Sequence, residues 1–153
     1  MKARTIRISL ALLVVLAISV TVASAEKPRR VYLRGSVIAV LRVPVRGMSI
    51  TTRYNMVKEC IRPALIDKAA TSKSARVEVA TKTEVKYFGS YKFEIRKGDN
   101  LLMVGKHIIH IITPEDAAAG QTTMAKQAKF LLANFKKKFD LSKITRGPER
   151  RSR

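Results

Sequence analysis

The sequence is poor in cysteine, in acidic residues and in long apolar runs, and each scarcity excludes something. Cys60 is the only cysteine among 153 residues, so no disulfide forms within the chain. Only 11 Asp and Glu residues stand against 31 Lys and Arg residues, a formal net charge of +20 at pH 7. A field of one sign on this scale favours a negatively charged partner. Composition alone leaves anionic lipid head groups, envelope polysaccharide and nucleic acid as candidates.

The one long apolar run lies at the N-terminus, where residues 10–22 are nearly all apolar. Cations precede this run and the small residues Ala23-Ser24-Ala25 follow it. This is the layout of a secretory signal peptide, so we expect residues 1–25 to be cleaved before Glu26. An uncleaved membrane anchor is the alternative, although the run is shorter than the ~20 apolar residues that span a bilayer. We therefore expect a periplasmic or extracellular protein with no transmembrane span after cleavage, for which nucleic acid is disfavoured as a physiological partner.

The rest of the chain is predicted to hold one folded domain. Residues 26–30 form a basic linker, residues 31–140 a single α+β domain, and residues 141–153 a basic tail with so little to bury that we expect it to be disordered. The expected fold class is α+β, with a mainly antiparallel sheet packed against two amphipathic helices. About 110 residues are enough for one hydrophobic core.

Hydrophobic periodicity places the elements of this domain. Apolar residues at helical spacing predict amphipathic helices at 51–62 and 123–139, and Pro63 is expected to kink or end the first. A hairpin is expected around Gly35-Ser36. Short alternating or apolar runs separated by glycines predict an antiparallel meander. The expected strands are 31–34, 37–43, 76–82, 85–88, 91–95, 101–104 and 107–113. The last is apolar on both faces, which favours a central strand covered by helices.

The stretch HIIHIITPED, residues 107–116, raises the question of a metal or catalytic site. In a regular strand His107 and His110 point to opposite faces and cannot both bind one ion. A zinc-type site also needs three or four converging ligands. The remainder has a structural explanation, because Thr113 suits an N-cap, Pro114 suits the first helical position, and Glu115 and Asp116 lie where the helix dipole is positive. We expect a strand that leads into a helix, and no metal or other cofactor.

No nucleophile motif points to an enzyme. The sequence contains neither Gly-x-Ser-x-Gly nor Ser-x-x-Lys, and Cys60 falls on the apolar stripe of the first helix, where a buried thiol is expected. Lys97-Gly98-Asp99 is like the adhesive tripeptide of some integrin ligands, but Gly98-Asp99-Asn100 is also what a tight turn between strands requires. We therefore expect a non-enzymatic protein, while an envelope hydrolase whose site forms only in the fold stays open as an alternative.

The last helix carries the candidate binding site. Opposite its apolar stripe lie cations and one aromatic residue, a layout used for interfacial membrane contact or for stacking on a polyanion. The residues of this anion-binding candidate are Lys126, Lys129, Phe130, Lys136 and Lys137. The structural alternative is that the lysines only solvate the helix, helped by the dipole at its C-terminus, while Phe130 meets a loop.

Several stretches together resemble a known domain. They are VYLRGSVIAVLRV, the Gly47 and Ser49 before the first helix, HIIHIITPEDAAAGQTTM and AKQAKFLLANF. Residues 31–139 are in this respect similar to a small exported domain of uncharacterised bacterial proteins, and to the extracytoplasmic N-terminal domain of some small-conductance-type mechanosensitive channels. The resemblance implies an exported α+β module and no catalytic residues. This sequence lacks the channel helices and the tryptophan of the last helix, so channel activity does not carry over.

These observations favour an exported, non-enzymatic binding or structural module. We expect it to associate with an anionic envelope component, either lipid head groups or polysaccharide, through a basic surface. Besides the hydrolase, the alternative is an adaptor that binds an acidic face of an envelope protein. The pattern does not fix the ligand or the oligomeric state.

Overall fold

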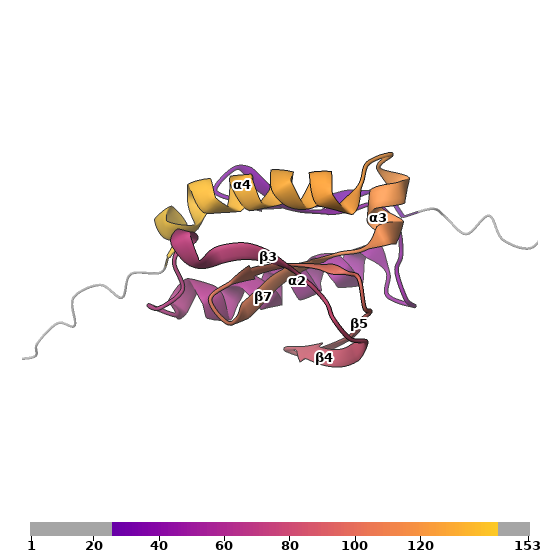
Figure 1. Ribbon diagram of the computed structural model, residues 1–153, viewed down its shortest axis with the longest axis horizontal. Coiled ribbons are helices and arrows are strands. Elements are labelled where there is room, and N and C mark those ends of the chain that lie inside the picture. The colour runs from indigo at the N-terminus through magenta and orange to yellow at the C-terminus, as the bar shows by residue number, and fades with distance from the viewer. Residues whose placement is uncertain (1–25, 144–153) are drawn as a thin grey trace, which may run out of the picture.

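The computed structural model describes residues 26–143, in which some of the short strands lie between two long helices (Figure 1). The expected signal peptide, and the tail from residue 144 onward, lie outside the described residues. The strands are antiparallel and form three small sheets, so the α+β class is confirmed. The elements are β1 Arg29–Leu33, β2 Ser36–Leu41, α2 Ile50–Ile66, the 3₁₀ turn η1 Ser72–Ser74, β3 Ala75–Val79, β4 Glu84–Phe88, β5 Tyr91–Ile95, β6 Asn100–Val104, β7 His107–Ile112, α3 Pro114–Ala119 and α4 Met124–Ser142.

The predicted first hairpin is present as β1 and β2. Arg34 and Gly35 join the strands with φ of 44° and 79°. Two successive positive φ angles give a turn whose twist matches that of the flanking strands. The strand β1 begins at Arg29, so the last two residues of the expected linker belong to the hairpin.

The predicted meander is wrong in its connectivity. β6 pairs with both β3 and β7, while β4 and β5 form a separate hairpin between β3 and β6 in the chain. β7 is therefore an edge strand and not the central one. Its apolar character on both faces has another cause. Ile109 and Ile112 enter one hydrophobic cluster and Ile108 and Ile111 the other, and α2 packs along the strand.

The two helices enclose most of the core. The first cluster lies among α2, α4, the β1–β2 hairpin and the three-stranded sheet, and the second among α2, the β4–β5 hairpin and the sheet. The predicted stripe of α4 is confirmed, since Ala128, Leu131, Phe135 and Phe139 are buried. No helix within residues 26–143 combines the length and the apolar character needed to cross a bilayer.

Both helices run further than the sequence predicts. Pro63 does not end α2, which continues to Ile66. Proline removes one helical hydrogen bond, but the following turn is retained because Ala64 is fully buried and the Asp67 amide donates to the Pro63 carbonyl at 3.2 Å. α4 reaches Ser142, two residues into the segment expected to be a tail.

Candidate functional site

The five residues predicted to bind anions all lie on the exposed side of α4. Thr123 begins the helix, because its side chain accepts a hydrogen bond from the Lys126 amide at 3.2 Å. Each residue then turns the helix by about 100°. Because Leu131, Phe135 and Phe139 face the core, the opposite side is presented to solvent. Exposed on that side are Lys126, Lys129, Phe130, Lys136 and Lys137.

The cations of this face lack acidic partners. Among residues 26–143, no carboxylate lies within 4.0 Å of the Lys126, Lys129, Lys136 or Lys137 ammonium. The structural alternative draws on the dipole at the C-terminus of the helix, and this dipole does not act on these lysines. The helix runs on to Ser142, so none of these lysines lies in its last turn. The arrangement is a group of solvated positive charges without a carboxylate partner among the described residues.

Two further residues of α4 belong to this side and were missed in the sequence. Leu141 is 61 % exposed, compared with 54 % for Phe130. Asp140, the only acid of the helix, accepts hydrogen bonds from the Ser72 amide at 2.9 Å and its hydroxyl at 2.6 Å. These bonds to Ser72 are the main cause of a lowered pKa at Asp140. The one carboxylate is thereby directed to η1, while Leu141 adds a second apolar side chain beside the lysines.

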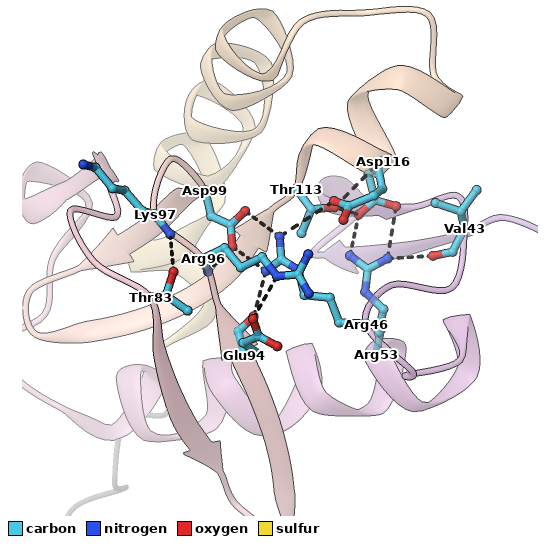
Figure 2. A network of polar contacts seen from close by, with 11 residues as sticks. Val43, Arg46, Arg53, Thr83, Glu94, Arg96, Lys97, Asp99, Thr113 and Asp116 are labelled. Carbon is cyan, nitrogen blue, oxygen red and sulfur yellow. Dashed lines mark hydrogen bonds and ion pairs between the residues drawn. The ribbon is translucent and has the colours of Figure 1, made fainter.

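A second cationic region is buried between α2 and α3 (Figure 2). Arg53 of α2 donates to both carboxylate oxygens of Asp116 of α3, from Nη1 at 3.1 Å and from Nη2. Its Nη1 also donates to the Val43 carbonyl at 2.8 Å. The side chains are 2 % and 0 % exposed. Burial raises the pKa of Asp116, but its bonds to Arg53 and to the Arg42 amide outweigh this and leave the pKa below its ordinary value.

Thr113 and Pro114 play their predicted roles at the start of α3. The Thr113 side chain accepts from the Asp116 amide at 3.3 Å, and Pro114 is the first residue of the helix. The prediction was incomplete for Asp116. Its carboxylate was expected only to complement the helix dipole, whereas it is the buried partner of Arg53. Glu115 lies 3.8 Å from the Arg46 guanidinium and is partly exposed.

Arg46 and Asp99 form a second buried pair next to the first (Figure 2). The Arg46 guanidinium donates to the two carboxylate oxygens at 2.5 and 2.8 Å and to the Glu94 carbonyl at 2.7 Å. The bond to Asp99 raises the pKa of Arg46. Arg46 reaches this position from a turn closed between Val45 and Met48.

The turn reading of Lys97-Gly98-Asp99 is confirmed. The Asp99 amide donates to the Arg96 carbonyl at 3.0 Å, and Gly98 has a φ of 95°. Asp99 itself is 1 % exposed and engaged with Arg46. An adhesive tripeptide must present its carboxylate to a partner, and this carboxylate is turned inward.

The two histidines have separate environments. His107 Nε2 lies 2.7 Å from Asp67 Oδ2, and this contact is the first cause of a lowered pKa at Asp67. His110 is buried, and burial followed by the charge of Arg53 lowers its pKa to about 3. Its Nε2 has no hydrogen-bond partner among the described residues. Among residues 26–143, no three His, Cys, Asp or Glu side chains lie close enough together to hold one metal ion.

One cleft lies between α2, the β4–β5 hairpin and the start of β7. It has a volume of about 270 Å³. Its floor includes Cys60, for which the predicted burial is confirmed. Burial and the neighbouring Glu59 raise the pKa of this thiol to about 12, which keeps it protonated and unreactive. The lining residues are Glu59, Cys60, Pro63, Lys86, Tyr87, Phe88, Gly89, Lys106, His107 and Ile108.

Sequence reasoning missed the buried arginines, although Arg53 carried a signal. It lies three residues after Ile50 and four before Val57, on the stripe that was assigned to the core. A cation on a buried stripe requires an anionic partner, and Asp116 was available. Arg46 and Asp99 gave no comparable signal because each lies in a turn.

Comparison of the chain with family models, curated proteins and solved structures finds no match. The resemblance to the extracytoplasmic domain of mechanosensitive channels therefore stays an expectation.

Proposed function

We propose that the protein is an exported, non-enzymatic module that attaches to an anionic component of the cell envelope, lipid head groups or polysaccharide, through the exposed face of α4. The observation that carries this proposal is the gathering of four exposed lysines and Phe130 on one helix face without any acidic partner among residues 26–143.

The distribution of the acidic residues supports the same conclusion. Every carboxylate among the described residues is engaged, either with a cation or with hydrogen-bond donors of the protein. Those beside a Lys or Arg side chain are Glu59, Glu78, Glu84, Glu94, Asp99, Glu115 and Asp116. Asp67 accepts from the Ala69 amide and contacts His107 Nε2. Glu26 accepts from the Ile50 amide and Asp140 from Ser72. The negative charge is thus used internally, and the excess positive charge is left for a partner.

The geometry also favours an extended ligand over a small one. The lysines are spread over three turns of a straight helix face and not around the cleft, which lies beside α2 and β7. Each exposed lysine near an anionic surface contributes on the order of 1 kcal/mol of attraction. Several such contacts act together on a membrane or a polymer, and all of them weaken as salt screens them over about 8 Å.

The test compares two triple variants of equal net charge in the chain that starts at Glu26. This start is chosen because the preceding apolar segment would itself enter vesicles. One variant is Lys126→Gln, Lys129→Gln and Lys137→Gln. The control is Lys92→Gln, Lys97→Gln and Lys106→Gln, whose lysines are also exposed and also have no ion-pair partner among the described residues. The basic residues after 143 are the same in both.

The expected result is that the α4 variant loses most of its retention on phosphatidylglycerol vesicles or on heparin, while the control stays close to the parent chain. Raising the salt concentration should release the parent chain. Equal losses in the two variants would mean that net charge alone binds, and the assignment to α4 would be withdrawn. Retention that neither variant reduces would overturn the proposal and favour the adaptor or the hydrolase.

A further inference from the structure

On the exposed side of α4, apolar and cationic side chains lie on separate lines along the helix. Binding by charge alone would not require this separation. Phe130 and Leu141 are 54 % and 61 % exposed and lie eleven residues apart. Eleven residues are close to three helical turns, so the two side chains lie on one line along the helix, about 16 Å apart. Lys126 and Lys137 have the same spacing and form a parallel line beside the first. Lys129 and Lys136 lie further round the helix, on the side away from Phe130.

On the side of the apolar line away from the lysines, α4 contacts the rest of the protein. There the Asn134 side-chain amide donates to the Val37 carbonyl of β2 at 3.1 Å. Going around the helix, the surface therefore passes from two lines of lysines to a line of exposed apolar residues, and then to the body of the protein. Full burial of a Phe or Leu side chain is favourable, and here both remain in water. A ligand that carries only negative charge offers no apolar environment in which these two side chains can be buried.

We propose that this face rests on an anionic lipid bilayer, with Phe130 and Leu141 inserted among the upper acyl chains and the lysines at the head groups. This inference rests on the proposed function and chooses the lipid over the polysaccharide. Leu141 decides the choice, because an aromatic ring can stack on a sugar but a branched aliphatic side chain needs an apolar phase. Lysine stems suit this arrangement, since they extend along apolar surface while their charges stay at the interface.

The absence of tryptophan from the sequence makes the inserted position directly observable. Phe130→Trp places a single fluorophore at the proposed contact. Tyr87→Trp is the matched control, because Tyr87 is 72 % exposed on β4, which lies on the opposite side of the molecule from α4 (Figure 1). Both proteins start at Glu26 and are mixed with vesicles of phosphatidylglycerol and phosphatidylcholine that carry brominated acyl chains, or with dextran sulfate.

With the vesicles, the emission of the tryptophan at 130 should shift to the blue and be quenched by bromine, while that at 87 should not change. Dextran sulfate should produce neither effect. Binding of the vesicles without quenching at 130 would overturn this inference and leave the proposed function intact. If the protein bound neither the vesicles nor dextran sulfate, the proposed function itself would be overturned. Quenching at 87 in place of 130 would assign the contact to another face.

Leu141→Gln gives an independent test that introduces no fluorophore. Its control is Ile66→Gln, at a residue of α2 that is 64 % exposed. Loss of one apolar contact with the acyl chains should weaken vesicle binding by about tenfold. The affinity for dextran sulfate should be unchanged, and Ile66→Gln should leave both affinities unchanged. Equal effects of the two substitutions, or none from Leu141→Gln, would contradict the insertion of Leu141.

Discussion

Two groups of cations among residues 26–143 behave in opposite ways. Arg46 and Arg53 are buried, and each is bound by a carboxylate from a distant part of the chain. The lysines of the α4 face are exposed and have no such partner among residues 26–143. Positive charge thus holds elements together in one region and is left free in the other. A net charge counted from the sequence does not distinguish these two uses.

The energetics of the two regions differ for the same reason. Removing one partner of a buried pair leaves a charge that neither water nor protein compensates, which costs about 3–5 kcal/mol. An exposed charge is solvated before and after folding, so it contributes little to stability. The lysines of α4 are therefore free to be selected for binding, whereas the arginines are constrained by the fold.

The largest effect is expected from Asp116→Asn. The substitution preserves the shape of the side chain and leaves the buried Arg53 without its counter-charge. The free energy of unfolding, measured with urea, should fall by about 3–5 kcal/mol. Glu59→Gln is the control, since its pair with Arg62 is exposed and should contribute less than ~1 kcal/mol. Similar losses of unfolding free energy in the two variants would show that the buried ion pair contributes no more to stability than the exposed one.

The next effect is a dependence of stability on pH that originates at His110. The pKa of His110 is lowered to about 3 in the folded protein, and the ordinary value is 6.5. Below pH 6.5 the unfolded chain binds a proton that the folded chain does not, so the free energy of unfolding should decrease as the pH falls. Between about pH 6.5 and 4.5 the loss should be about 2–3 kcal/mol, at 1.36 kcal/mol per pH unit.

His110→Leu isolates this contribution. It removes the titrating group together with an Nε2 that has no partner among the described residues, so the variant should lose less stability on acidification than the parent chain. The difference between the two unfolding free energies should narrow or reverse in favour of the variant as the pH drops. Parallel curves would show that His110 is not the origin of the acid sensitivity.

The smallest effect on stability is expected from the α4 variant with glutamine at 126, 129 and 137. These side chains are exposed and unpaired among the described residues, so the free energy of unfolding should change by less than ~1 kcal/mol in total. The measurement is again urea unfolding, and the same preparation must have lost its retention on anionic vesicles. A loss of stability like that of Asp116→Asn would mean that the lysines serve the fold.

Local patterns predicted the helices and the exposed lysines, because helical periodicity is a short-range property of the sequence. Leu131, Phe135 and Phe139 fixed which side of α4 is buried, and therefore which side carries Lys126 and Phe130. Leu141 was missed only because the helix was expected to end at 139.

Long-range pairing was not predictable in the same way. β4 and β5 are separate from the β3–β6–β7 sheet because β3 pairs with β6, which follows it only after the β4–β5 hairpin. The residues of short strands bounded by glycines do not specify such a pairing partner. The apolar pattern of β7 indicated burial on both faces correctly. It also predicted cover by helices, which α2 supplies, but it did not reveal that β7 lies at the edge of its sheet. The partners of Arg46 and Arg53, 53 and 63 residues away, lie beyond local patterns as well.

We propose that the free cations of α4, and not the positive charge as a whole, make the contact with an anionic surface. The most direct measurement is a titration of the isotopically labelled chain from Glu26 with anionic bicelles, followed residue by residue through backbone amide NMR shifts. We expect the largest changes to cluster at residues 126–141 and to disappear at high salt, while β4, β5 and the Arg46 turn are unaffected. Changes spread evenly over all exposed lysines, or centred on another element, would contradict it.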